Sequence, residues 1–289
     1  MQYFLNGLPI GAIYALVALG YSLIYASAGV LNWSQGDMVM LGAYIGYLLY
    51  RLLGINFVVS LGVSMVAVAL IGMLVERSVL RPLRKRQAPA INMVIATLGV
   101  AIISRNIALV IWGPDAQAFP SPVGSSSVQM GSLSIIPQDI LIVSVGLAVM
   151  LFLQYFLGYT REGKALRAVA QDRAAAILMG VDVKNSDALA FAVSSMMGAA
   201  AGILIAPVFF VTFNMGSGIG LKGFVAAVVG GLGNIPGAIA GGFFLGLTES
   251  MAGGKISSGY RDVIAFVLLI LVLWLKPSGL FSRRIHQKV

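Results

Sequence analysis

A short polar run interrupts the apolar N-terminal part of the sequence. It reads Asn32-Trp33-Ser34-Gln35-Gly36-Asp37 and separates two apolar segments. Amide, hydroxyl and carboxylate groups at such an interruption could guide a polar solute, as unwound corners do at membrane depth. The candidate pathway residues are Asn32, Ser34, Gln35 and Asp37. The alternative interpretation is a simple turn between two helices.

A second informative stretch, Tyr159–Val183, is polar and basic but carries apolar residues at helical spacing. These apolar residues are Leu166, Val169, Ala170, Ala174, Ile177 and Leu178. The pattern predicts one or two short helices with an apolar side available for contact. Such a surface could dock a partner, with charges setting the register and small residues allowing close approach. The alternative is an ordinary loop lying against the membrane interface.

Two nucleotide-binding patterns fail on inspection. The stretch Gly158–Ala165 matches GxxxxGK, but Ala165 lacks the hydroxyl that would hold Mg²⁺ and no strand precedes the glycines. Gly218, Gly220 and Gly223 fit GxGxxG without the strand and acidic residue of a dinucleotide site. If this protein uses ATP, another chain must bind it.

Composition excludes several other chemistries. The 289 residues include no Cys, and the only His is His286, so cysteine and multi-histidine metal sites and Ser–His triads are ruled out. Hydrophobic residues make up 59% and charged residues 10%. Mean hydropathy is +0.94. A soluble surface needs more charge than this, so we expect a polytopic membrane protein.

The apolar runs predict an all-α integral membrane protein, a helical bundle of about 8 transmembrane helices (range 7–9), in one domain over residues 1–289. The predicted segments are Phe4–Tyr25, Met38–Leu53, Phe57–Val75, Ile91–Ile111, Ile140–Leu157, Ala188–Ala206, Leu221–Leu232, Ala238–Thr248 and Val263–Leu275. The seventh and eighth are short and rich in Gly, which indicates half-helices or a re-entrant hairpin.

Basic residues predict the orientation. Fourteen of the 19 lie in three blocks, which should therefore be cytoplasmic. The blocks are Arg77, Arg81, Arg84, Lys85 and Arg86; Arg161, Lys164, Arg167, Arg173 and Lys184; and Lys276, Arg283, Arg284 and Lys288. The loop Trp112–Asp139 has no Lys or Arg and should face outward, and the parity of the spans places the N-terminus outside and the C-terminus in the cytoplasm.

Few charges fall inside the apolar segments. Arg105 and Glu249 lie near segment ends, so we expect both to snorkel to the interface, and Asp37 is the candidate intramembrane acid. Glycines recur as GxxxG pairs, which predict close helix packing within one chain or across a dimer. These pairs are Gly7/Gly11, Gly42/Gly46, Gly198/Gly202, Gly237/Gly241 and Gly242/Gly246.

Motifs along essentially the whole chain resemble the permease subunits of branched-chain amino-acid ABC importers, the Liv type, and the H-like subunit more than the M-like one. The matching stretches are Asn6–Leu8, Gly11–Leu16, Ala18–Gly20, Leu23–Tyr25, Asn32–Asp37, Leu41–Tyr44, Gly163–Ala168, Gln171–Asp172, Met179–Val181, Lys222–Val228, Gly230–Ala238, Tyr260–Asp262 and Pro277–Phe281.

The resemblance implies a transport subunit of the bacterial inner membrane and no enzyme. Its implied partners are a second related permease (in a heterodimer or a homodimer), two cytoplasmic ABC ATPases and a periplasmic substrate-binding protein. ATP and Mg²⁺ would be used by the ATPases, with no cofactor, metal or nucleic acid bound by this chain. The cargo would be leucine, isoleucine, valine or a related hydrophobic solute.

Within that family an EAA loop, Glu-Ala-Ala-x-x-x-Gly, docks on the ATPase. The resemblance places this coupling loop at about residues 158–187. Here Ala174, Ala175, Ala176 and Gly180 keep the spacing, but Ala174 replaces the acid. Asp172 and Arg173 lie beside it and could supply charge.

Two alternatives remain open. A urea or short-amide ABC permease would share the same motifs. An ion-coupled secondary transporter or channel is the alternative from another class, and it would require more charged residues at membrane depth.

Overall fold

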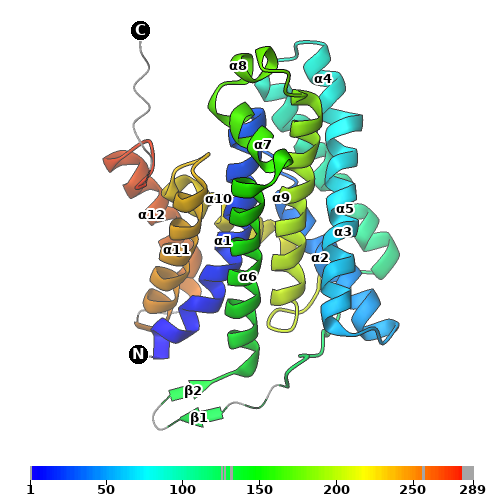
Figure 1. The fold of residues 1–289 in the computed structure, drawn as a ribbon. Helices are drawn as coiled ribbons and strands as arrows, with labels where there is room; N and C mark the ends of the chain where they lie inside the picture. Colours follow the sequence, from blue (N-terminus) through cyan, green and yellow to red (C-terminus); the bar gives the residue numbers. More distant parts are fainter. Residues whose placement is uncertain (1, 125, 127, 131–132, 256–257, 282–289) are drawn as a thin grey trace.

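The computed structural model describes residues 2–124, 126, 128–130, 133–255 and 258–281. Nine apolar helices in this part of the chain each overlap one predicted segment. They are α1 (Gln2–Ala28), α2 (Gln35–Tyr47), α3 (Phe57–Val75), α5 (Ala90–Trp112), α6 (Pro137–Tyr159), α9 (Val183–Ile205), α10 (Met215–Gly230), α11 (Ile235–Lys255) and α12 (Arg261–Leu275). Their sequential arrangement is shown in Figure 1.

Shorter elements lie at the two ends of this bundle. Figure 1 shows α4 (Arg81–Lys85), α7 (Arg161–Gln171) and α8 (Arg173–Leu178) at one end. At the other end a small antiparallel hairpin joins β1 (Val128–Met130) to β2 (Leu133–Ile135) and adds two strands to the predicted helical fold. Single turns occur at η1 (Leu48–Leu52), η2 (Glu76–Leu80) and η3 (Ser258–Tyr260).

Helix length and composition confirm a polytopic helical membrane protein. Within the described residues, 5 helices are long and apolar enough to cross a membrane: α1, α3 with its continuation to Lys85, α5, α6 and α9. The 16-residue α10 is apolar but shorter. α11 has 21 residues, about 31 Å at 1.5 Å per residue. The predicted half-helix at this eighth segment is therefore wrong, and α11 is a full-length helix.

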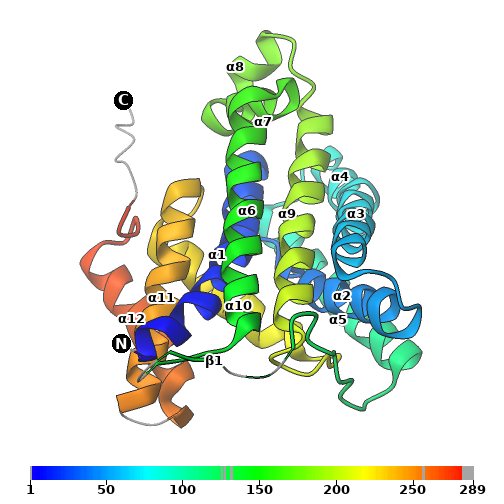
Figure 2. The same ribbon diagram turned by 60° about the horizontal axis from the view of Figure 1, so that its bottom comes forward.

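α1 and α9 form the centre of the bundle. Within each of them 89% of the most apolar stretch is buried, against 17% in α5 and 28% in α3 and α6. In both views, α11 and α12 lie on one side of α1, and α3 and α5 on the other (Figures 1 and 2). The outer helices expose apolar side chains, because their outward faces are solvated by lipid tails.

Small residues bring the helix backbones together. The α1 pair Gly7/Gly11 faces the α11 pair Gly242/Gly246, and a Cβ added at Gly11 would lie 3.0 Å from the Cα of Phe243. The pair Gly42/Gly46 of α2 meets α9, and Gly198/Gly202 of α9 meets α2. The GxxxG pairs therefore pack helices within the chain, one of the two predicted uses.

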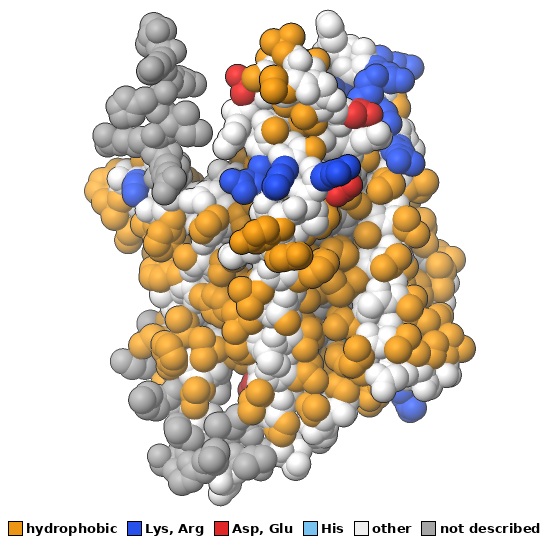
Figure 3. Space-filling view, in the orientation of Figure 1, with side chains coloured by type: hydrophobic (Ala, Val, Ile, Leu, Met, Phe, Trp, Pro, Cys, Tyr) orange, Lys and Arg blue, Asp and Glu red, His pale blue; other side chains and the backbone are white. Residues whose placement is uncertain are grey.

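The ends of the bundle differ in charge, as the basic loops predicted. Both described basic loops lie at the α4–α8 end, where Arg81 donates to the backbone oxygen of Lys184 at 2.9 Å. Figure 3 shows Lys and Arg gathered around this end above a mainly hydrophobic flank. Gln2 bonds with Ser134 at the opposite end, so the N-terminus and the predicted outer loop share a face. Arg283, Arg284, His286 and Lys288 lie outside the described residues.

Candidate functional site

The polar break, residues Asn32–Asp37, lies inside the bundle. After α1 ends, Gly29 adopts φ +66° and the chain turns inward. α2 then begins at Gln35, whose side chain bonds with Ser194, the middle residue of α9. The break is therefore an interior corner at mid-depth of the bundle. Of the two interpretations of the sequence, the structure supports the unwound corner.

The first turns of α2 and α10 meet at this corner. A Cβ on Gly36 would overlap the backbone of Gly216, and one on Gly220 would overlap Gly36. α2 continues through η1 to Leu52, which makes a helical segment of 18 residues, and α10 has 16 residues. They are about 27 and 24 Å long, less than the roughly 30 Å of a bilayer core. Both short helices thus begin in the middle of the bundle, the arrangement that transporters use to expose helix termini at membrane depth.

The four candidate pathway residues are buried, and each is hydrogen-bonded within the chain. Asn32 Oδ1 accepts from the Ser34 hydroxyl at 2.7 Å. Gln35 Nε2 donates to the Ser194 carbonyl at 3.0 Å, while Ser194 Oγ donates back to Gln35 Oε1 at 2.8 Å. Because burying an unpaired amide or hydroxyl is costly, these bonds stabilise the corner in the conformation seen here.

Aromatic rings close the corner on the α10 side. Phe224 packs edge-on against Tyr21 at 5.7 Å between ring centroids and lies 5.4 Å from Trp33. The backbone N–H of Trp33 donates to Thr97 Oγ1 of α5 at 3.1 Å. Four helices therefore contribute to the surroundings of the break, and an apolar wall lies next to its polar groups, which is the composition of a site for an amphipathic solute.

The prediction that Arg105 snorkels to the interface is wrong. Its Nε donates to Asp37 Oδ1 at 2.6 Å, so Arg105 does not snorkel but binds the candidate intramembrane acid. The side chain of Asp37 is buried, and a buried carboxylate requires such a partner. The pair joins the outer helix α5 to the first turn of α2.

The same prediction for Glu249 is also wrong. It is buried, binds the ammonium of Lys222, and accepts from the hydroxyl of Tyr14 at 2.9 Å. Lys222 also reaches Asp262 at 2.8 Å. Lys222 had no predicted role. A signal was available, because isolated charges of opposite sign within apolar segments are expected to pair.

The coupling loop folds into two capped helices. The Thr160 hydroxyl oxygen accepts from Gly163 N at 3.0 Å and begins α7, while Asp172 Oδ1 accepts from Ala174 N and Ala175 N at 2.9 Å each and begins α8. The three bonds satisfy free helix N–H groups. Gly163 packs against the end of α6, so the GxxxxGK match belongs to a helix start.

Gly180 ends α8 with φ +81°, and its N–H donates to Ile177 O at 3.0 Å. A left-handed residue here favours glycine, which explains the spacing from Ala174 to Gly180. Just before it, Ile177, Leu178 and Met179 are 58%, 87% and 85% exposed. We call these three residues the α8 tip. It is an exposed apolar surface at the basic end of the bundle.

The charged residues at the start of α8 are used in contacts within the chain. Arg173 donates to Asp187 of α9 and to the backbone oxygen of Ser27, at 2.6 and 3.0 Å for its shortest bond to each. The carboxylate of Asp172 caps α8. Of the predicted coupling residues, Ala176 is buried against Val169 and Val183. The side chains that α8 presents outward are therefore mainly apolar.

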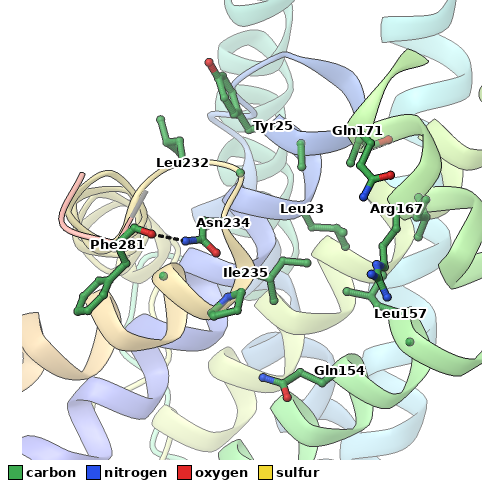
Figure 4. Close-up of a pocket in the computed structure, with 18 residues that line it drawn as sticks. Leu23, Tyr25, Gln154, Leu157, Arg167, Gln171, Leu232, Asn234, Ile235 and Phe281 are labelled. Atoms are coloured by element: carbon green, nitrogen blue, oxygen red, sulfur yellow. Dashed lines mark hydrogen bonds between the residues drawn. The ribbon is translucent and has the colours of Figure 1, made fainter. Parts of the chain in front are cut away.

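A cavity of about 1030 Å³ lies beside α7 at the same end. Figure 4 shows Arg167 and Gln171 of α7 on one side and Asn234 and Ile235, from the α10–α11 connection, on the other. The side chain of Asn234 is held by a 2.7 Å bond to the backbone oxygen of Phe281. In the part of the chain that the structure describes, no group of three or more His, Cys, Asp or Glu could hold a metal ion.

Short helices that meet inside an apolar bundle, together with an apolar tip on its basic end, define a helical membrane transport protein. Residues 3–273 match the family described as the branched-chain amino acid transport system permease component, and the chain belongs to that family.

Individual relatives agree with this assignment. The chain is 34% identical to the high-affinity branched-chain amino acid transport system permease protein LivH of Salmonella typhimurium, over 100% of this chain and 97% of the relative. It is equally similar to BraD of Pseudomonas aeruginosa, over 98% of that protein. PsaBC from Streptococcus pneumoniae in complex with Fab has the same fold, with TM-score 0.51, 14% identity, and coverage of 96% of this chain and 93% of that one.

Proposed function

We propose that this chain moves branched-chain amino acids across the cytoplasmic membrane as the permease subunit of an ATP-driven importer. The observation that carries the proposal is the 34% identity over the full chain to permeases of branched-chain amino acid transport systems. The fold and the interior corner are consistent with it, since a zwitterion with an apolar side chain needs polar groups beside an apolar wall.

The partners follow from the same proposal. A second related permease completes the membrane unit, two cytoplasmic ATPases bind ATP and Mg²⁺, and an external binding protein delivers the solute. The α8 tip is the ATPase contact, because exposed apolar side chains on a capped helix fit a partner's cleft. Ala174, Ala175 and Gly180 shape this helix, and Asp172 caps its start. Arg173 links the helix to Asp187 of α9 and is not part of the docking surface. This end, with the C-terminus, faces the cytoplasm.

The substrate pathway passes the polar break in this proposal. Asn32, Ser34, Gln35 and Asp37 are closed off here, so solute passage requires the corner to open. Closure by internal hydrogen bonds is a reversible form of gating, because water or solute groups can replace each bond.

Reconstitution of the chain with the transport proteins that its neighbouring genes encode tests the function. Uptake of labelled leucine should require hydrolysis-competent ATPases, and labelled urea should not compete. Urea uptake instead of leucine uptake would support the amide-permease alternative. Leucine uptake that persists with hydrolysis-deficient ATPases would overturn the ATP-driven assignment and favour an ion-coupled transporter, for which the buried charges Asp37, Lys222 and Glu249 would be the first candidates.

A further inference from the structure

A group of charged residues connects α8 to the helices beneath it. The side chain of Asp187 in α9 is fully buried and binds Arg173 of α8, at 2.6 and 3.1 Å, and Arg84 of α4. It also accepts from the Ser27 hydroxyl at 3.1 Å. The equally buried Glu76 binds Arg81 at 2.9 Å. We call this group the basic-end cluster; its members are Ser27, Glu76, Arg81, Arg84, Arg173 and Asp187.

Within this cluster Arg173 has a special place. It is the first residue of the six-residue helix α8, which carries the α8 tip at its other end. Its guanidinium reaches both oxygens of Asp187, the planar bidentate geometry that makes such pairs directional and stiff. A third bond ties it to the backbone of Ser27. Arg173 therefore joins α8 to the end of α1 and to α9 at once.

Both of those helices hold the polar break. Ser27 lies in the last turn of α1, five residues before Asn32. α9 carries Ser194, which exchanges hydrogen bonds with Gln35. A displacement of α8 that Arg173 transmits to α1 and α9 thus acts on the two sides of the corner. The route consists of directional bonds between helices, and networks of this kind can carry coupling between distant sites.

We propose that Arg173 is a positioning residue that couples ATPase-driven movement of α8 to opening of the polar break, through Asp187 and Ser27. This inference rests on the proposed function, because it presumes that an ATPase moves α8. Arg173 touches neither ATP nor solute. Its role is to couple the two movements, so that the corner opens whenever α8 moves.

Arg81 is a matched control. It also forms an ion pair with a buried carboxylate of the cluster, Glu76, and bonds to a backbone oxygen, that of Lys184. The exposed fractions of the two arginine side chains are similar, 23% for Arg81 and 38% for Arg173. None of the hydrogen bonds or ion pairs among the described residues joins Arg81 to α8, however. Arg81→Gln therefore removes a comparable ion pair while leaving the proposed link intact.

The experiment uses the complete reconstituted importer and measures leucine uptake and ATP hydrolysis together. Arg173→Gln should keep ATPase co-purification and hydrolysis but lower leucine moved per ATP by about tenfold, within the usual range of coupling between sites. Arg173→Lys keeps the charge but not the planar fork, so its leucine moved per ATP should lie between that of Arg173→Gln and that of the wild type. It replaces Arg173→Gln in the test if that variant does not insert into the membrane. Arg81→Gln should transport per ATP as wild type does.

A second readout follows the corner directly. Because the chain contains no cysteine, Leu31→Cys introduces a single thiol beside the break. Its reaction rate with a maleimide should change on ATP binding in the otherwise wild-type chain and in Arg81→Gln, but not in Arg173→Gln. Wild-type coupling in Arg173→Gln, or an equal loss in Arg81→Gln, would overturn the inference. Absence of ATP-dependent uptake in the wild type would instead overturn the proposed function.

Discussion

The side chain of Gln35 is held at both ends by Ser194. Its Nε2 donates to the Ser194 carbonyl at 3.0 Å and its Oε1 accepts from the Ser194 hydroxyl at 2.8 Å. This exchange joins the start of α2 to the middle of α9 across 159 residues of sequence. It places the polar break inside the bundle and makes the geometry of the corner depend on one amide.

Gln35→Leu should loosen the corner. The substitution removes both bonds and leaves the buried Ser194 hydroxyl without this partner, which should lower the free energy of unfolding by about 1–3 kcal/mol. Ser194→Ala keeps the Nε2 bond to the carbonyl and should cost less. Thermal unfolding in detergent measures both, and leucine uptake should fall further for Gln35→Leu. Equal stability of the two variants would contradict the double anchoring.

Lys222→Met should be strongly destabilising. It leaves Glu249 buried with only the Tyr14 hydroxyl as a described partner, and an uncompensated buried carboxylate costs about 3–5 kcal/mol. Asp262→Asn is the control, because the side chain of Asp262 is 74% exposed and the other carboxylate of Lys222 remains. The amount of monodisperse protein recovered after solubilisation reports the difference. Restoration by the double variant Lys222→Met/Glu249→Gln is expected, since no buried charge then stays unpaired, and Asp262 is exposed.

Gly246→Ala should disrupt the contact between α1 and α11. The added methyl group overlaps the backbone of Gly11, and overpacking of this kind costs about 1–3 kcal/mol. Gly62→Ala is the matched control on α3, where a Cβ meets nothing within 4 Å. The unfolding temperature should drop for the first and not for the second. Helix propensity by itself favours Ala over Gly, so a similar drop in both variants would contradict the packing explanation.

Leu178→Asp should prevent ATPase docking while the chain still inserts. A charge at the centre of an apolar contact should weaken co-purification of the ATPases by at least about tenfold, as for a central interface residue. Leu178→Met keeps an apolar side chain of similar volume and should bind normally. Gly180→Arg should block docking as well, because φ +81° disfavours any side chain and Arg adds bulk beside the tip. If both Leu178→Asp and Gly180→Arg still co-purified with normal amounts of ATPase, the ATPase contact would have to lie elsewhere on the chain.

Local pattern was sufficient for much of the architecture. Apolar runs predicted where nine helices lie, because the length of an apolar run is set by the bilayer that it must cross. The basic loops predicted which ends lie together, and the apolar spacing within Tyr159–Val183 predicted one or two short helices at one of them. These features depend on residues close together in the sequence, and the structure bears them out.

Pairings between residues far apart in the chain could not be predicted from the sequence. Arg105 and Glu249 were expected at the interface, yet each binds an opposite charge, 68 and 27 residues away. Whether a charge near a segment end snorkels or pairs depends on the rotation and depth of its helix, and packing of several helices sets both.

The sequence by itself therefore determined a helical membrane protein with basic loops, a short helix on one of them and a polar break. Only the tertiary structure decided that the break lies in the middle of the bundle, that Arg173 points to Asp187, and that the apolar α8 tip is exposed. The physical reason is that spans follow from local hydropathy, whereas buried polar groups must find partners wherever helix packing brings them.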